Sequence, residues 1–108
     1  MKRIYVAGPY TKGDVAVNVR VAIAAGNALA EAGALPFIPH LTHFWHLCCP
    51  HNWQFWLGYD LEWLRLCDAV LRLPGESTGA DLEVMEAERL GKPVLCSVGE
   101  TLRWLKEQ

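Results

Sequence analysis

The chain lacks any long apolar run. No stretch of its 108 residues approaches the ~20 apolar residues that a membrane-spanning helix needs. The N-terminal segment "MKRIYVAGPY" begins with basic residues, but its apolar part is too short for a secretory signal peptide and leads straight into a turn. We therefore expect a cytoplasmic protein without a membrane partner.

Disulfide-type cysteine spacing and an excess of positive charge are also absent. The four cysteines form no CxxC pair and no pattern typical of a disulfide framework. The net charge is −2, and the basic residues are scattered along the chain. Because nucleic-acid binding proteins usually carry a basic patch that neutralises phosphates, we expect no nucleic-acid partner. A small molecule or another protein remains as the partner.

The pattern that is present alternates strands with helices, without repeats or a linker, so we expect one domain over residues 1–108. Predicted strands span 3–7, 35–39, 69–73 and 93–97, predicted helices span 15–32, 54–68, 80–90 and 99–106, and residues 40–53 are predicted to be irregular. Such alternation is typical of a parallel sheet covered on both faces. The prediction is a flavodoxin-like α/β three-layer sandwich with strand order 2-1-3-4 and right-handed crossovers.

This topology predicts where a ligand binds. In open α/β sheets the site lies beyond the carboxyl ends of the strands, where the strand order reverses. Here the two loops at that point are "GPYTKGD" (8–14) and "PGESTG" (74–79), which are rich in glycine and hydroxyl groups. The helix that follows the second loop turns its N-terminus toward the same place, which suits an anion. An ordinary tight turn before a helix would look the same.

Two carboxylates fall on the apolar faces of their predicted helices. On a helical wheel, Glu83 lies between Leu90 and Ala87, while Asp60 lies beside Leu64. An inward carboxylate is costly unless it is paired, hydrogen-bonded or next to a cavity. One interpretation is a structural ion pair for each residue. The other is a shared pocket, because both helices flank the predicted crevice.

A pair of carboxylates in a partly apolar pocket suits cleavage of a glycosidic bond. One group attacks or stabilises the anomeric carbon, and the other manages the proton of the leaving group. Tyr5, in the first strand, is placed to orient a carboxylate through its hydroxyl, although plain core packing explains it equally well.

Three segments resemble the nucleoside 2-deoxyribosyltransferase-like family, which includes the deoxyribosyltransferases and the 2'-deoxynucleoside 5'-phosphate N-hydrolases. They are "IYVAGPY", "YDLEWLRLCDAVLRL" and "STGADLEVMEAERLGKPV", and the likeness runs from about residue 3 to 97. The resemblance implies that Glu83 is the nucleophile, that Asp60 contacts the base or manages its proton, and that Tyr5 holds Glu83. It also implies ligand contacts from the two loops, at Gly8, Pro9, Tyr10, Ser77 and Gly79, with Ser77 near the 5' end.

The implied activity is cleavage of the N-glycosidic bond of a (deoxy)nucleoside or nucleoside 5'-monophosphate, by base transfer or by hydrolysis, without a cofactor. Subunit-shared sites in the family, together with five tryptophans in a small chain, predict a homodimer or larger homo-oligomer. Two alternatives stay open. One is a related NAD or nucleotide glycohydrolase, and the other is a non-catalytic nucleotide-binding or scaffolding module.

The segment 40–53 has no counterpart in the family and is rich in metal-ligand types. It holds four histidines and two cysteines, but their spacing matches no zinc motif and no acidic residue lies among them. We therefore expect no metal, and instead a loop that lines the pocket or contacts another subunit. His40 and His43 follow the second strand, so each either touches substrate or simply packs. Trp45, Trp53 and Trp56 either stack on a nucleobase or form aromatic core.

Overall fold

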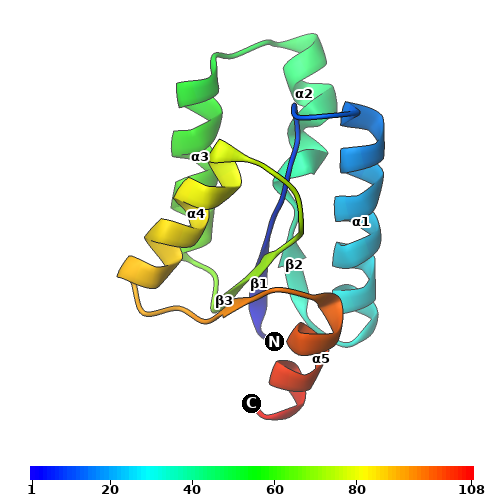
Figure 1. Cartoon of the computed structure of the whole chain (residues 1–108), viewed down its shortest axis with the longest axis vertical. Helices are drawn as coiled ribbons and strands as arrows, with labels where there is room; N and C mark the ends of the chain where they lie inside the picture. The colour runs from blue at the N-terminus through cyan, green and yellow to red at the C-terminus, as the bar shows by residue number, and fades with distance from the viewer.

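The computed structural model describes residues 1–108, and its centre is a four-stranded parallel sheet (Figure 1). The strands are β1 (Arg3–Ala7), β2 (Leu35–Phe37), β3 (Ala69–Arg72) and β4 (Val94–Leu95). Their order is β2-β1-β3-β4, and every neighbouring pair is parallel. The predicted flavodoxin-like architecture and strand order are confirmed.

Helices cover both faces of this sheet. They are α1 (Val15–Glu31), α2 (His43–Cys48), α3 (Trp53–Arg65), α4 (Thr78–Arg89) and α5 (Val98–Lys106). Figure 1 shows α1 and α5 on one side of the sheet and α3 and α4 on the other, with α2 beyond the carboxyl ends of the strands. None of these helices has the length and apolar character needed to cross a membrane.

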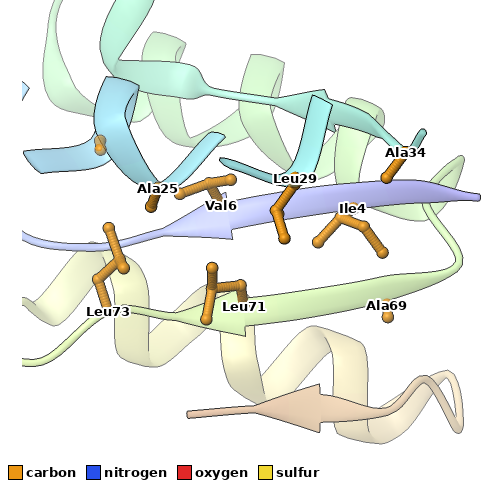
Figure 2. Close-up of a cluster of buried hydrophobic side chains, with 9 residues drawn as sticks. Ile4, Val6, Ala25, Leu29, Ala34, Ala69, Leu71 and Leu73 are labelled. Atoms are coloured by element: carbon orange, nitrogen blue, oxygen red, sulfur yellow. The ribbon is translucent and has the colours of Figure 1, made fainter. Parts of the chain in front are cut away.

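The alternation of side chains along β1 decides which residues meet which helices. Successive residues of a strand point to opposite faces, so Ile4 and Val6 join a buried cluster with Leu29 of α1 (Figure 2). Partly buried residues of α5 pack against the same cluster. Tyr5 points the other way and joins a second buried cluster with residues of α3 and α4, such as Leu64 and Ala80. This arrangement places the Tyr5 ring on the face of the sheet that α4 covers.

Several predicted boundaries were wrong by a few residues because local hydrogen bonds end or begin the elements. Helix α4 begins at Thr78 rather than at residue 80, since the Ser77 side chain accepts a hydrogen bond from the Ala80 amide. Helix α3 ends at Arg65 rather than at residue 68, because the Asp68 amide donates instead to the carbonyl of Arg3 in the sheet.

The prediction that residues 40–53 are irregular was wrong for residues 40–48 and for Trp53, and only residues 49–52 lack regular structure. Residues Pro39–Thr42 form a 3-10 turn, η1, and His43–Cys48 form the short helix α2. Thr42, a residue type that often caps helices, precedes α2, but its hydroxyl donates to the Pro39 carbonyl at 2.8 Å, so no side chain caps the N-terminus of this helix. Contacts with α3 hold this segment instead, including a hydrogen bond from Trp56 Nε1 to His46 Nδ1.

Candidate functional site

A cleft of about 820 Å³ opens at the carboxyl ends of the strands. Its walls come from the loop after β1, from η1 and α2, from one face of α3, and from the loop after β3 with the start of α4. Seven of the ten predicted catalytic and substrate-binding residues line it: Gly8, Tyr10, His40, Asp60, Ser77, Gly79 and Glu83. The two predicted loops therefore meet at one cleft, together with both carboxylates.

Glu83 lies at the inner end of this cleft, 6% exposed. The helix that carries it begins directly after the β3 loop, and position 83 falls on the same buried face as Ala80 and Ala87. Its Oε2 accepts a hydrogen bond from the Tyr5 hydroxyl at 2.5 Å. The expectation that Glu83 faces inward is confirmed.

Burial is the main influence on the acidity of Glu83. Loss of solvation raises the pKa of its carboxyl to about 8, the Tyr5 hydrogen bond lowers it, and the nearby Asp60 charge raises it again. Arg72 also lowers the pKa of Glu83, although its guanidinium is paired at 3.0 Å with Asp81. The carboxyl is thus kept poorly solvated, as reactive carboxyls commonly are.

Asp60 is the second carboxyl of the cleft and is half-buried. Burial raises its pKa to about 7, and its Oδ1 is shut off from solvent without a hydrogen-bond partner. Neither Asp60 nor Glu83 belongs to any of the five ion pairs of the chain. The interpretation of these two carboxylates as structural ion pairs is therefore wrong.

Tyr5 lies behind Glu83 and does not line the cleft. Its side chain is fully buried, and burial together with the Glu83 and Asp60 charges raises the pKa of its hydroxyl. Its ring stacks on Phe37 of β2 at a centroid distance of 5.6 Å, and Phe37 stacks in turn on Trp63 of α3 at 5.1 Å. This stack fixes the Tyr5 ring, so its hydroxyl is a fixed donor to Glu83.

The histidines of η1 and α2 connect the second strand to the first loop. His40 is buried, and its Nε2 donates to the carbonyl of Pro9 at 2.9 Å. Burial lowers the pKa of His40, which favours the neutral ring, and its buried Nδ1 has no partner. His43 Nδ1 lies 2.5 Å from the Tyr10 hydroxyl. Pro9 and His43 themselves do not line the cleft; they contact residues that do.

The rim of the cleft carries charges that the sequence reasoning missed. Lys12, from the first loop, pairs at 3.1 Å with Glu76 from the second, and both side chains are largely exposed. Ser77, which also lines the cleft, accepts the cap hydrogen bond from the Ala80 amide at its Oγ, and its hydroxyl proton remains free to donate. Gly75 allows the two loops to meet, because its φ of +115° suits glycine and a Cβ there would lie 2.8 Å from Pro9 Cγ.

The segment around α2 and the start of α3 forms the aromatic wall of the cleft. Trp53, Trp56, Leu57 and Asp60 all line it, and their spacing of three, four and seven residues places them on one helical face. From this spacing the sequence alone could have predicted that the two tryptophans and Asp60 face the same cleft. His46 and His51 extend the same wall, whereas Trp45 lies outside it. No three His, Cys, Asp or Glu side chains converge anywhere in a way that could hold a metal ion.

The family model described as "Domain of unknown function (DUF7768)" matches residues 2–97. The chain belongs to this family. The match ends after β4, so it includes every segment that builds the cleft of this DUF7768 protein. A search of curated protein sequences gave no match.

Solved structures of 2-deoxyribosyltransferases resemble this DUF7768 protein in fold. The enzyme from Bacillus psychrosaccharolyticus superposes with a TM-score of 0.65 at 24% identity, over 85% of this chain and 69% of that one. The enzyme from Leishmania mexicana gives a TM-score of 0.65 at 22% identity, over 88% of this chain and 63% of that one. The chain therefore has the nucleoside 2-deoxyribosyltransferase-like fold, in a form that spans less than two thirds of the Leishmania protein.

Proposed function

We propose that this protein cleaves the N-glycosidic bond of a (deoxy)nucleoside or nucleoside 5'-monophosphate, by base transfer or by hydrolysis. The observation that carries the proposal is a buried Glu83, held by the buried Tyr5 hydroxyl and set in one cleft with the protonatable Asp60. The fold shared with two 2-deoxyribosyltransferases supports the same chemistry.

In the first step an ionised Glu83 oxygen bonds to the anomeric carbon of the sugar while the bond from that carbon to the base nitrogen breaks. The electron pair of the broken bond goes to the base. The Tyr5 hydroxyl supports this step because its hydrogen bond to Oε2 favours the charged form of Glu83 and holds the carboxylate in place.

Asp60 supplies the proton that the departing base needs. A pKa raised to about 7 lets a carboxyl hold a proton near neutral pH and release it to a base of rising basicity. The two carboxyls thereby take opposite roles, with Glu83 ionised and Asp60 protonated. Because the pKa of Glu83 is about 8 and that of Asp60 about 7, this is the less populated of the two forms in which the pair shares one proton, and turnover proceeds through that fraction.

The glycosyl ester on Glu83 is then resolved by an acceptor. When water attacks the anomeric carbon, Asp60 takes its proton, the ester bond to Glu83 breaks, and the free sugar leaves. When the nitrogen of a second base attacks, its proton passes to Asp60 and a new nucleoside forms. In both cases Glu83 returns as a carboxylate.

Free base is the product that tests this proposal. Purified protein is incubated with ribo- and deoxynucleosides, their 5'-monophosphates and NAD, with and without an acceptor base, and free or exchanged base is measured by chromatography. We expect release or exchange from at least one nucleoside or monophosphate, and none with a Glu83→Gln variant. Release from NAD alone would favour a glycohydrolase for larger nucleotides, and ligand binding without turnover would favour a non-catalytic module.

We also propose that the protein acts as a homo-oligomer. Large apolar side chains stand exposed on and beside α2, with Phe44 74% and Leu47 62% exposed. Trp53, at the start of α3, is 52% exposed. An apolar surface of this kind on a small domain commonly marks a contact between subunits.

A further inference from the structure

His46 is held at the cleft wall in a defined protonation form. Its Nδ1 accepts two hydrogen bonds, from Trp56 Nε1 at 2.8 Å and from the His51 backbone amide at 3.3 Å. An indole N–H and an amide N–H can only donate, so Nδ1 carries no proton and the neutral ring bears its proton on Nε2.

The Nε2 proton of His46 has no partner within the protein. The hydrogen bonds of this side chain all involve Nδ1, and Nε2 is not among the buried atoms that lack a partner. Because His46 lines the cleft, its free N–H is a donor available to a ligand there. The hydrogen bond from Trp56 thus keeps the proton of His46 on Nε2, and this N–H is the donor that faces the cleft.

The position of this donor relative to Asp60 points to the part of the ligand that it meets. Trp56 precedes Asp60 by one helical turn on α3, and both side chains line the cleft. A planar base whose glycosidic nitrogen lies at Asp60 extends along this face, past the Trp56 indole, toward His46.

We propose that His46 Nε2 donates a hydrogen bond to a nitrogen of the six-membered ring of the leaving base, or to a carbonyl oxygen on that ring, and so selects heteroaromatic bases that carry such an acceptor. This inference rests on the proposed function, since it takes Asp60 as the group beside the glycosidic nitrogen. The electron pair of the breaking bond raises the negative charge on the acceptors of the base, so the same hydrogen bond strengthens as the base departs.

Binding of free bases tests the proposal without requiring turnover. The probes are purine and benzimidazole, which have the same bicyclic shape, although benzimidazole lacks the two nitrogens of the six-membered ring. Dissociation constants are measured on the full chain by calorimetry, for the wild type and for His46→Phe and His46→Gln. A phenylalanine keeps an aromatic ring without a donor, whereas a glutamine amide restores an N–H near the place of Nε2.

We expect the wild type to bind purine about three- to tenfold more tightly than benzimidazole, which is the usual range for one hydrogen bond. We expect His46→Phe to bind both probes equally and His46→Gln to regain most of the preference. Melting curves of all three proteins show whether each is folded. A wild type that binds neither probe, or a preference that survives in His46→Phe, would overturn the proposal.

The outcome also separates this inference from the proposed function. A purine preference that depends on His46 in a protein that releases no base would support the base subsite and refute the glycosidase. Base release from nucleosides together with an unchanged preference in His46→Phe would refute the role of His46 alone.

Discussion

The Tyr5 hydroxyl donates to Glu83 Oε2 at 2.5 Å, although the two residues are 78 positions apart in the sequence. One comes from the first strand and the other from α4, and each is buried. The pKa of the Tyr5 phenol and the pKa of the Glu83 carboxyl are both raised. The Tyr5 proton therefore stays on the phenol, and its hydrogen bond stabilises the negative charge of Glu83 when that carboxyl ionises.

We predict that Glu83→Gln lowers the rate of base release by about a thousandfold or more, because the amide keeps the shape of the side chain but cannot form the glycosyl ester. The measurement is base release per folded molecule on the best substrate of the panel. An unchanged rate would end the assignment of Glu83 as the nucleophile.

The same variant should gain stability, and the gain should depend on pH. Because the folded-state pKa of Glu83 is raised from 4.5 to about 8, protonation of this one carboxyl favours the folded state. Its contribution to the free energy of unfolding is fully present below about pH 4.5 and is lost as the pH rises toward 8. A glutamine does not titrate. We therefore expect the melting temperature of Glu83→Gln to exceed that of the wild type by a margin that grows between pH 5 and 8. A constant margin across this range would contradict the assignment of the raised pKa to Glu83.

The activity should have a bell-shaped dependence on pH with its maximum between about 7 and 8. Turnover needs Glu83 ionised and Asp60 protonated, so it falls in acid as Glu83 gains a proton and in alkali as Asp60 loses one. Asp60→Asn should remove the alkaline limb. It should not move the acid limb to lower pH, because Asp60 is already uncharged in the form of the wild type that turns over. The profile of kcat/KM against pH for both proteins provides the test.

Tyr5→Phe removes the donor to Glu83 while keeping the ring that stacks on Phe37. Because this hydrogen bond lowers the pKa of Glu83, its loss should raise that pKa further and move the acid limb of the rate profile to higher pH. At pH 7 we expect kcat/KM to fall by roughly tenfold, as for the loss of one charge-assisted hydrogen bond. The matched control is Tyr59→Phe, since Tyr59 lies on α3 outside the cleft and should leave the profile unchanged. An acid limb that stays in place in Tyr5→Phe would show that Tyr5 serves packing only.

The histidines and cysteines around α2 should bind no stoichiometric metal. Protein purified without a metal-affinity tag should contain well below one zinc per chain by elemental analysis, because the ligand types do not converge on one point. About one zinc per chain that resists dialysis would contradict this prediction.

Light scattering should give a mass of at least twice the 12.1 kDa of one chain. Replacing the exposed Phe44 and Leu47 by serine should shift the mass toward that of the monomer if α2 forms the contact. A wild type that is monomeric at working concentration would refute the oligomer.

The sequence was sufficient for the sheet and for the inward direction of Glu83, because short apolar runs that end in turns and the helical wheel are local patterns. It was not sufficient for α2, whose first turn has no side-chain cap and which depends on contact with α3. The tautomer of His46 was likewise beyond reach, since it is set by Trp56, ten residues away and on another helix. The ion pair between Lys12 and Glu76 depends on how two loops lie against each other, and the spacing of residue types in the sequence does not predict that arrangement.

The bridge between Lys12 and Glu76 has a consequence for how a ligand enters. Exposed ion pairs of this kind contribute only roughly 0–1 kcal/mol, so the bridge is easily broken. Below it the loops are in firm contact at Gly75 and Pro9. The rim of the cleft therefore opens without separation of the two loops, and added salt, which screens exposed charges, favours the open rim while the contact between Tyr5 and Glu83, which is buried, is left unchanged.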